Sequence, residues 1–238
     1  MRLERPRPRP LKDQVAGELR RLIEQHLKPG DQLMSERELS EQLRVSRGTV
    51  REAVQFLHAL GLVEIRHGSG TFVRATHSGR DELRAQWRRW TLRHAERIHE
   101  LLEVRRGLES FAAALAAQRL ADRGVETMAE ALAQMASAAA GADVAAAVEA
   151  DALFHHGLCE ATGNPTLVEL DDALCKQLVP ERAATWDLPG RAQRSIEEHG
   201  AIFEAIRRRD GDGAQAAAIA HLTSVERDLR NALFPRRE

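Results

Sequence analysis

Three segments in the second half of the chain place metal-binding side chains on otherwise apolar helical faces. Asp151 and His155 are four residues apart, the spacing at which two side chains of one helix can bind the same ion. His199 and His221 each share a predicted helical face with Ala, Ile, Val, Leu or Phe residues. An imidazole on a buried face is unfavourable unless it is hydrogen-bonded. The spacing leaves two interpretations open: a shared metal site, or histidines that are satisfied within a packed core.

A second group of side chains that could do chemistry, mostly arginines, lies near the N-terminus. Arg37 and Arg47 fall in the first turns of two consecutive predicted helices, and Arg51 follows Arg47 by four residues. A guanidinium can bind a guanine edge with two hydrogen bonds, or a phosphate. Thr49 stands between the last two arginines and could contact phosphate or base. A solvated helical face would explain one such arginine, but three on a two-helix unit favour DNA binding.

The elements that must position these arginines are typical of a winged helix-turn-helix. Apolar periodicity predicts a first helix from Leu11 to about residue 27. Ser35 begins a second helix through a capping box with Glu38, and Ser46 caps a third that ends near Gly61. Two strand-like runs, 62–66 and 71–74, then form a hairpin.

The Gly-rich connection of that hairpin is the predicted tip of the wing. It reads His67-Gly68-Ser69-Gly70. Gly68 lets the backbone approach a nucleic acid closely, and the imidazole of His67 can donate to phosphate or to a base edge. We therefore expect both residues to reach toward the minor groove.

The charge of the chain is unevenly distributed. The formal net charge of −1 taken alone argues against nucleic-acid binding. Residues 1–76, however, carry 14 Lys/Arg and 10 Asp/Glu, whereas residues 77–238 carry 21 and 26. A basic DNA reader joined to a neutral or acidic module has this asymmetry.

The rest of the chain predicts an all-α antiparallel bundle of six or seven helices, so that the fold class is mainly α. Residues 81–233 are Ala-rich, with Gly- or Pro-containing breaks and no convincing strand. One helix is expected to start at residue 98, and another spans 165–185 and is kinked or ended by Pro180. The predicted organisation is a flexible Arg/Pro arm (1–10), the winged helix-turn-helix (11–74), a linker (75–80) and the helical domain (81–235).

Composition and cysteine spacing argue against several classes of protein. There is no long apolar run and 30% of the residues are charged, which predicts a soluble chain without a membrane span. The Arg/Pro repeat at the start does not resemble a signal peptide. Cys159 and Cys175 have no CxxC spacing, so we expect a reducing cytoplasm.

The N-terminal motifs resemble those of the GntR family of bacterial regulators over residues 11–74. The matching stretches are PGDQLMSEREL (29–39), VSRGTVREA (45–53), GLV (61–63) and HGSGTFV (67–73). The resemblance implies that DNA is contacted by Arg37, Arg47, Thr49, Arg51, His67 and Gly68. Two positions depart from the pattern: Met34, where the family usually has Pro, and Gly48, where relatives often have Thr or Ser.

The helical half is similar to the FadR-like branch of that family, whose effector domain is called FCD. The matching features are Glu103-Val104-Arg105 with Leu108-Glu109, Asp151-x-x-Phe154-His155, Gly163-Asn164-Pro165, Glu198-His199 and His221. In that branch one Asp and three His hold a divalent metal, which matches Asp151, His155, His199 and His221. The resemblance implies Zn²⁺ or Ni²⁺, although ligand type does not identify the ion.

The same resemblance implies a small carboxylic acid as effector, bound at free coordination positions of the metal. Arg105 would be its anion partner, although an exposed helical arginine beside Arg106 is an equally simple interpretation. Asn164 is a second candidate contact, beside the role of a turn former.

The sequence thus predicts a homodimeric, metabolite-responsive repressor that reads an inverted-repeat operator in double-stranded DNA and is not an enzyme. Two alternatives stay open. An Asp/His₃ metal with an open position could activate water in an enzyme with a fused DNA-binding head, but no general base stands beside it. A bundle that only dimerises would use the histidines as packed core.

Overall fold

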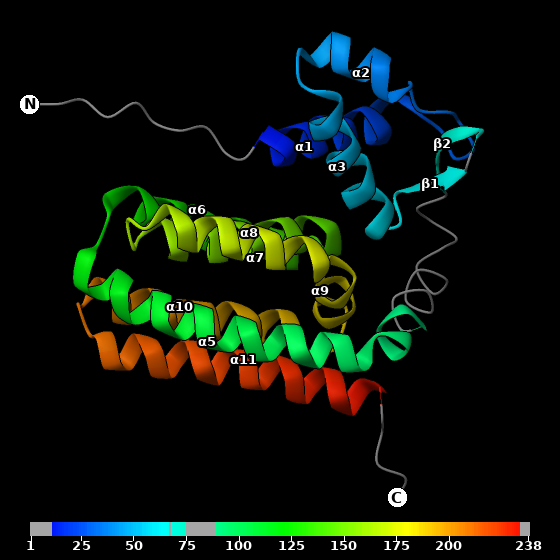
Figure 1. The fold of residues 1–238 in the computed structure, drawn as a ribbon. Helices are drawn as coiled ribbons and strands as arrows, with labels where there is room; N and C mark the ends of the chain where they lie inside the picture. Colours follow the sequence, from blue (N-terminus) through cyan, green and yellow to red (C-terminus); the bar gives the residue numbers. More distant parts are fainter. Residues whose placement is uncertain (1–10, 67, 75–88, 234–238) are drawn as a thin grey trace, which may run out of the picture. The chain divides into compact units, whose positions relative to one another are not determined.

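The computed structural model describes residues 11–66, 68–74 and 89–233, and it divides into two compact units, Met1–Leu83 and Arg84–Glu238. The predicted arm 1–10, the predicted linker 75–80 and His67 lie outside the described residues. Both units are mainly helical, as predicted, and among the described residues strands occur in the first unit alone (Figure 1).

The first unit contains the three helices and the hairpin expected of a winged helix-turn-helix. Its core joins the apolar stripe of the first helix (Val15, Leu19) to that of the third (Val50, Leu57), with Leu39 of the second helix closing one side. The hairpin pairs its strands antiparallel, with Val63 opposite Val73. The elements are α1 (Leu11–His26), α2 (Glu36–Leu43), α3 (Arg47–Ala59), β1 (Val63–Arg66) and β2 (Gly70–Val73).

Local hydrogen bonds fix the turn between α2 and α3. The capping box is present: the Ser35 hydroxyl accepts from the amide of Glu38, whose carboxylate accepts from the amide of Ser35. α2 ends where Arg44 adopts a left-handed conformation (φ 54°), and Ser46 caps α3 by accepting from the amide of Thr49 at 3.1 Å. These contacts set the angle at which α3 leaves α2.

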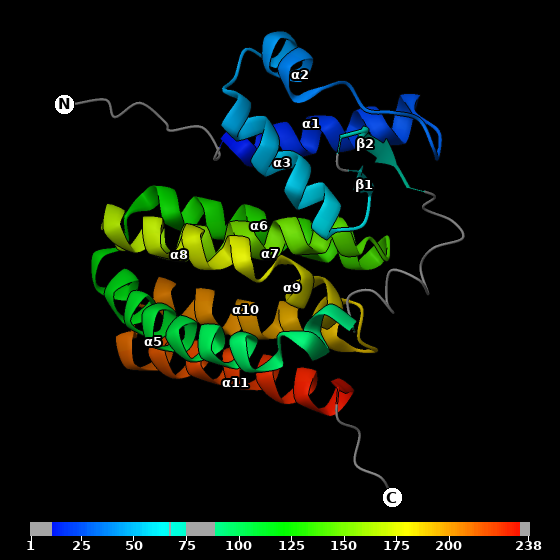
Figure 2. The same ribbon diagram turned by 45° about the vertical axis from the view of Figure 1, so that its right-hand side comes forward.

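The second unit is an all-α bundle arranged in two layers. Figures 1 and 2 show α6, α7 and α8 side by side in one layer and α5, α10 and α11 in the other, with α9 at one end. Because buried faces of both layers meet, a side chain on the inner face of α7 can contact residues of α10 and α11. The elements are α5 (Ala95–Arg119), α6 (Asp122–Ala140), α7 (Val144–Glu160), α8 (Pro165–Gln177), α9 (Val179–Trp186), α10 (Arg191–Arg207) and α11 (Gly211–Leu233).

Two predicted helix boundaries in this unit were misplaced. The single helix expected over 165–185 is two helices, because α8 ends at Gln177 and α9 begins at Val179 with Pro180 in its first turn. Proline is tolerated there because its missing N–H would have no helical partner. α5 begins at Ala95, just after a turn at His94, and not at residue 98.

Close packing of α6 against α7 depends on two glycines. A Cβ at Gly124 would overlap the backbone of Ala161, and one at Gly157 would lie 3.0 Å from the amide nitrogen of Met128. Gly157 is half a turn from His155. The close approach therefore holds the segment that carries the predicted metal ligands.

Candidate metal centre and nucleic-acid interface

The four predicted metal ligands come from three helices and meet between the two layers of the bundle. Asp151 and His155 lie on the inner face of α7, His199 on α10 and His221 on α11. All four are buried, with exposed fractions of 0 to 4%. The structure brings together residues that are as much as 70 positions apart in the sequence.

The distances within this cluster suit a shared cation. The nitrogens that His155, His199 and His221 offer all lie within 4.8 Å of one another, and the Nε2 atoms of His155 and His199 are 3.1 Å apart. Oδ1 of Asp151 is 3.4 Å from Nε2 of His199, and Oδ2 is 3.7 Å from Nε2 of His155. Ligands that each bind one ion at about 2.0–2.2 Å have separations of this size.

The other nitrogen of each imidazole faces an acceptor. Nδ1 of His199 donates to the backbone carbonyl of Ser195 at 2.6 Å, and Nδ1 of His221 lies 2.9 Å from a carboxylate oxygen of Glu198. Nδ1 of His155 lies 2.9 Å from Oε2 of Glu109. The Nε2 atoms of His155 and His199 lie opposite each other, and an acceptor behind each ring is the arrangement that orients metal-ligating histidines in proteins.

Arginines hold the two carboxylates that support the imidazoles. Arg191 makes two hydrogen bonds to Glu198, at 3.1 and 2.8 Å. Arg105 donates from Nε to Glu109 across one turn of α5. A buried carboxylate without such a partner would be strongly destabilising. The network therefore extends from His155 and His221 through a carboxylate to a guanidinium, whereas His199 is held by a backbone carbonyl.

The protonation states of His199, His221 and Asp151 fit those of metal ligands, whereas the pKa of His155 is raised: burial would lower it, but the Glu109 and Asp151 carboxylates together outweigh burial. Burial lowers the pKa of His199 well below its usual value and also lowers the pKa of His221, so both are neutral near pH 7. The pKa of Asp151 is well below its usual range: burial would raise it, but Arg182, His155 and His199 together outweigh burial. Metal binding requires deprotonated ligands of this kind.

A second group of buried charges adjoins Asp151. Nε of Arg182 lies 3.0 Å from Oδ2 of Asp151, and Arg182 interacts electrostatically with Arg105 and Asp171. Five buried polar atoms of this group have no hydrogen-bond partner among the described residues: Arg105 Nη2, Arg182 Nε and Nη1, Asp171 Oδ1 and Glu181 Oε2. An unsatisfied buried polar group costs about 1–3 kcal/mol, so these atoms indicate a missing partner.

The two predicted effector contacts differ in their surroundings. Arg105 is 2% exposed, so the interpretation of an exposed helical arginine is wrong. Asn164 is the N-cap of α8, where its side-chain oxygen accepts from the amide of Thr166 at 3.1 Å. The turn-forming role is thus present, and an effector contact by Asn164 stays a prediction.

Sequence reasoning did not identify the residues that support the cluster. Glu109 and Glu198 were noted only as parts of motifs, although Glu109 stands four residues after Arg105 and Glu198 directly before His199. Arg182, Asp171 and Glu181 were not singled out, because the charges that surround them come largely from other helices. Charged residues at apolar positions of a predicted helical face are the signal that could have found them.

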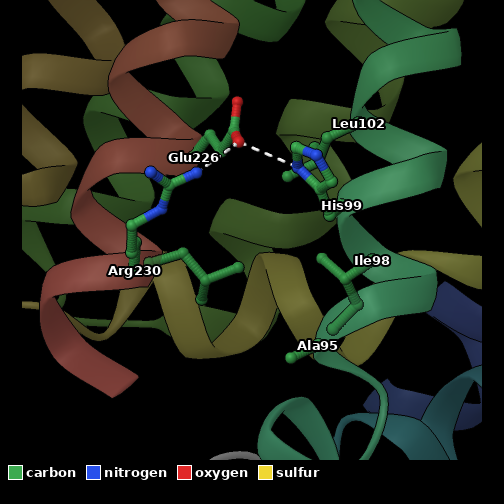
Figure 3. Close-up of a pocket in the computed structure, with 7 residues that line it drawn as sticks. Ala95, Ile98, His99, Leu102, Glu226 and Arg230 are labelled. Atoms are coloured by element: carbon green, nitrogen blue, oxygen red, sulfur yellow. Dashed lines mark hydrogen bonds and ion pairs between the residues drawn. The ribbon is translucent and has the colours of Figure 1, made fainter. Parts of the chain in front are cut away.

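A surface cavity of about 130 Å³ lies between the first turns of α5 and the last turns of α11 (Figure 3). Ile98, Leu102 and Leu229 form its apolar wall, and Glu226 joins His99 to Arg230 at the rim. None of the four predicted metal ligands lines it. Ligand pockets usually have about 300–1,000 Å³, so this cavity is too small to mark an effector site.

The predicted DNA contacts lie at the start of α2 and α3. Arg47, at the first position of α3, is exposed, and Arg37 is exposed with only a 3.6 Å ion pair to Glu41. Arg51 hydrogen-bonds to Glu36 of α2 at 2.7 Å, and the Thr49 hydroxyl lies 2.9 Å from that of Ser46. Arg47 is thus the most available of the four side chains.

The solvent face of α3 includes a residue that the sequence reasoning missed. Gln55 is exposed and follows Arg47 and Arg51 at intervals of four residues. A glutamine can bind adenine with two hydrogen bonds. The periodicity of the exposed positions in α3 would have identified it.

The wing is anchored to the rest of the first unit. Gly68 is exposed with φ 74°, a conformation that favours glycine, and the side chain of Gln32 donates to the carbonyl of Ser69 at 3.0 Å. Gln32 also forms a bridge to Phe72. The hairpin is therefore anchored to the segment between α1 and α2.

A winged helix-turn-helix joined to an all-α unit defines the class of DNA-binding transcriptional regulators. Comparison with protein-family models narrows the class: residues 11–73 match the gntR family of bacterial regulatory proteins, and residues 100–224 match the FCD domain. The chain belongs to the GntR family, in the FadR-like branch that carries an FCD domain.

Individual relatives agree with this assignment. The chain is 36% identical to the HTH-type transcriptional regulator LutR of Bacillus subtilis over 87% of this chain and 95% of LutR. It is 31% identical to the galactonate operon transcriptional repressor of Escherichia coli over 85% of this chain and 89% of that protein. A putative GntR regulator from Rhodococcus sp. RHA1 has a similar structure, with a TM-score of 0.53, 25% identity, and coverage of 93% and 98%.

These matches confirm a regulator and not an enzyme, as the sequence predicted. The alternative of a metal-dependent enzyme has no support among them. No helix in the described part of the chain is both long and apolar enough to span a membrane.

Proposed function

We propose that this chain is a homodimeric transcriptional repressor that a small hydroxylated carboxylic acid releases from DNA. The acid binds in the helical bundle next to a divalent metal, Zn²⁺ or Ni²⁺, held by Asp151, His155, His199 and His221. One observation carries the proposal: three buried imidazoles direct their Nε2 atoms at one point, beside a carboxylate and two buried arginines.

The metal part of the proposal rests on the supporting hydrogen bonds. Packed core histidines would have both ring nitrogens satisfied by the protein, whereas here the Nε2 atoms of His155 and His199 face each other at 3.1 Å. Nδ1 of His199 donates to the carbonyl of Ser195, so the Nε2 of His199 carries no proton in the neutral ring. When bound, a metal would supply positive charge to these lone pairs and a coordination position to a carboxylate.

The effector class follows from the unsatisfied atoms. Nη2 of Arg105 and Nη1 of Arg182 are donors suited to a carboxylate. Asp171 and Glu181 each present an unpartnered oxygen, and burial raises the pKa of both carboxyls, so each can pair with a hydroxyl. The galactonate operon transcriptional repressor is named for galactonate, a compound that combines a carboxylate with hydroxyls.

Repression requires that two winged heads read one operator. A two-fold dimer recognises an inverted repeat, with one α3 helix in each half-site. The acid can change DNA affinity only if it binds more tightly to the state that releases DNA.

A selection experiment tests the DNA-binding part. The full-length protein is used to select duplexes from a random pool, and we expect an inverted repeat to emerge. Arg47→Ala should weaken binding of the selected duplex by about 1–3 kcal/mol, as loss of a bidentate guanine contact does. Arg21→Ala, which removes an exposed arginine of α1, is the matched control. A pool without sequence enrichment would overturn this part.

A thermal-unfolding screen tests the effector part. Zn²⁺-loaded and chelator-treated protein are heated with 2-hydroxy acids and sugar acids, each paired with its deoxy analogue. An acid at 100 times its Kd should stabilise the metal-loaded protein by about 2.7 kcal/mol. The deoxy analogue and the chelated protein should show a smaller shift. Equal shifts with and without metal would refute the metal-centred site.

A further inference from the structure

One of the predicted DNA contacts is held by a carboxylate of the neighbouring helix. Glu36, the first residue of α2, accepts three hydrogen bonds from Arg51 of α3. Two come from Nε, at 3.1 Å to each carboxylate oxygen, and one comes from Nη2 at 2.7 Å. Surface ion pairs are usually weak, but a carboxylate bound by two nitrogens of one guanidinium is the geometry in which such a pair is held firmly.

The other two predicted DNA-binding arginines are held less firmly. Arg37 has an ion pair of 3.6 Å to Glu41, and Arg47 acts on Glu36 through its charge. The hydrogen bond from Arg51 is the largest influence on the pKa of Glu36, and together with the charges of Arg51 and Arg47 it lowers this pKa against the effect of burial. The carboxylate is therefore ionised near pH 7 and stays bound to Arg51.

The pairing leaves one edge of the Arg51 guanidinium available to DNA. Glu36 accepts from the edge formed by Nε and Nη2, whereas an arginine has five N–H donors in all. The edge formed by Nη1 and the second N–H of Nη2 points away from the carboxylate, because the guanidinium is planar and rigid. Two parallel donors of this kind match O6 and N7 of guanine.

The position of Arg51 on α3 suits this contact. Arg51 follows Arg47 by four residues, which is about 6 Å along the helix axis and nearly the same face. Its side chain is 56% exposed although it is bonded to Glu36. Both arginines can therefore reach into one groove, with Arg51 one turn further from the start of the helix.

The charge of the pair favours base reading over phosphate binding. An arginine alone attracts phosphates, which is the basis of binding without sequence preference. Arg51 and Glu36 together carry no net charge, and the carboxylate repels a phosphate that approaches it. The contact with a base edge depends on the direction of the donors, and Glu36 fixes this direction.

We propose that Glu36 is a positioning residue for DNA recognition. It directs the Nη1–Nη2 edge of Arg51 at one guanine of each half-site, and its charge weakens binding to unrelated sequences. The inference rests on the DNA-reading part of the proposed function and goes beyond it: it assigns Arg51 to a base, and it gives a role in specificity to a residue outside the predicted contacts.

The test compares binding of the full-length protein to the selected duplex and to a scrambled duplex, by fluorescence anisotropy at one salt concentration. Glu36→Gln should lower the ratio of the two affinities about tenfold. Binding to the scrambled duplex should tighten, because a negative charge is lost, and binding to the selected duplex should weaken. Glu18→Gln, which removes the carboxylate of an exposed pair with Arg21 on α1, is the matched control and should keep the ratio. An unchanged ratio in Glu36→Gln overturns the proposal.

Glu36→Asp separates the position of the carboxylate from its charge. Aspartate keeps the charge, but its side chain is one methylene shorter and does not reach Arg51 in the same geometry. The affinity for the selected duplex should fall, while the affinity for the scrambled duplex stays at the wild-type value. Wild-type affinities for both duplexes would reduce Glu36 to its charge and overturn the positioning role.

Selection from a random duplex pool identifies the base that Arg51 reads. Arg51→Ala and Glu36→Gln should lose the same guanine preference in each half-site, and the double variant should lose no more than Arg51→Ala alone. Losses at different positions, or losses that add, contradict the coupling of the two residues. Far-UV circular dichroism confirms that the variants are folded. A wild-type protein that selects no sequence overturns the proposed DNA-binding function itself, which is a different outcome from a wild-type preference in Glu36→Gln.

Discussion

Glu198 and His221 form the best-supported pair around the imidazole cluster: a carboxylate oxygen lies 2.9 Å from Nδ1 of the ring. Arg191 and the pairing with His221 lower the pKa of Glu198 to about 2 against the opposing effect of burial, so the carboxylate is ionised at any physiological pH. The pair fixes both the ring orientation and the nitrogen that carries the proton. Glu198 thus belongs to the site although it does not point into it.

We predict that Glu198→Gln weakens metal binding about 10- to 100-fold, the usual effect of removing a carboxylate behind a ligating histidine. The amide can still accept a hydrogen bond but has no charge. Competition with a chromogenic chelator measures the affinity. Glu197→Gln, which alters an exposed neighbour paired with Gln193, should change nothing. Equal affinities in both variants would mean that Glu198 is structural only.

Arg105→Lys should abolish the response to the acid while the protein stays folded. Lysine keeps the charge next to Glu109 but cannot bind that carboxylate through Nε and also offer the unpartnered Nη2. We expect the Kd of the acid to rise at least tenfold by calorimetry. Arg106→Lys is the control, because Arg106 faces Glu226 on the other side of α5. A normal acid affinity in Arg105→Lys would contradict the assignment.

The contact of α6 with α7 gives a prediction on stability. Gly124→Ala places a methyl group against the backbone of Ala161, which cannot move away as a flexible side chain would. We expect a loss of at least about 1–3 kcal/mol in the free energy of unfolding by urea. Gly200→Ala has open space around the new methyl group and should gain up to about 1 kcal/mol from higher helix propensity. A neutral Gly124→Ala would show that the helices separate easily.

The winged helix-turn-helix was largely predictable from the sequence, whereas the charged residues that surround the imidazole cluster were not. Capping residues such as Ser35 and Ser46 act within four positions, so their role is visible in a sequence. The pair Asp151 and His155 was also predictable, because the two residues are four positions apart on one helix. The pairing of Arg182 with Asp151, in contrast, joins α9 to α7, and only the packing of the bundle decides it. The break at Leu178 was missed because Pro180 can stand either inside a kinked helix or at the start of a new one.

The last prediction concerns Glu181, a fully buried carboxyl. Its Oε1 accepts from the hydroxyl of Thr185 at 3.0 Å, and its Oε2 has no hydrogen-bond partner. Burial raises its pKa in the folded state, and Arg105 and Arg182 offset only part of this effect. Below the pKa of the unfolded chain, about 4.3, the group is protonated in both states and does not affect stability. Above it, the unfolded state gains by ionising, so the stability that the protonated carboxyl provides is lost as pH rises toward the folded pKa.

Glu181→Gln removes this titration while keeping the acceptor for Thr185. The difference in unfolding free energy between the variant and the wild type should therefore grow as the pH rises above about 4.3, by at most about 1.4 kcal/mol per pH unit, and then level off. Urea unfolding at a series of pH values from 4 to 8, with chelator present so that no metal contributes, measures it. Glu169→Gln, at an exposed position of α8, is the matched control. A flat difference for Glu181→Gln would show that this carboxyl is ionised in the folded protein, and the hydroxyl of the effector would then meet a carboxylate instead of a neutral acid.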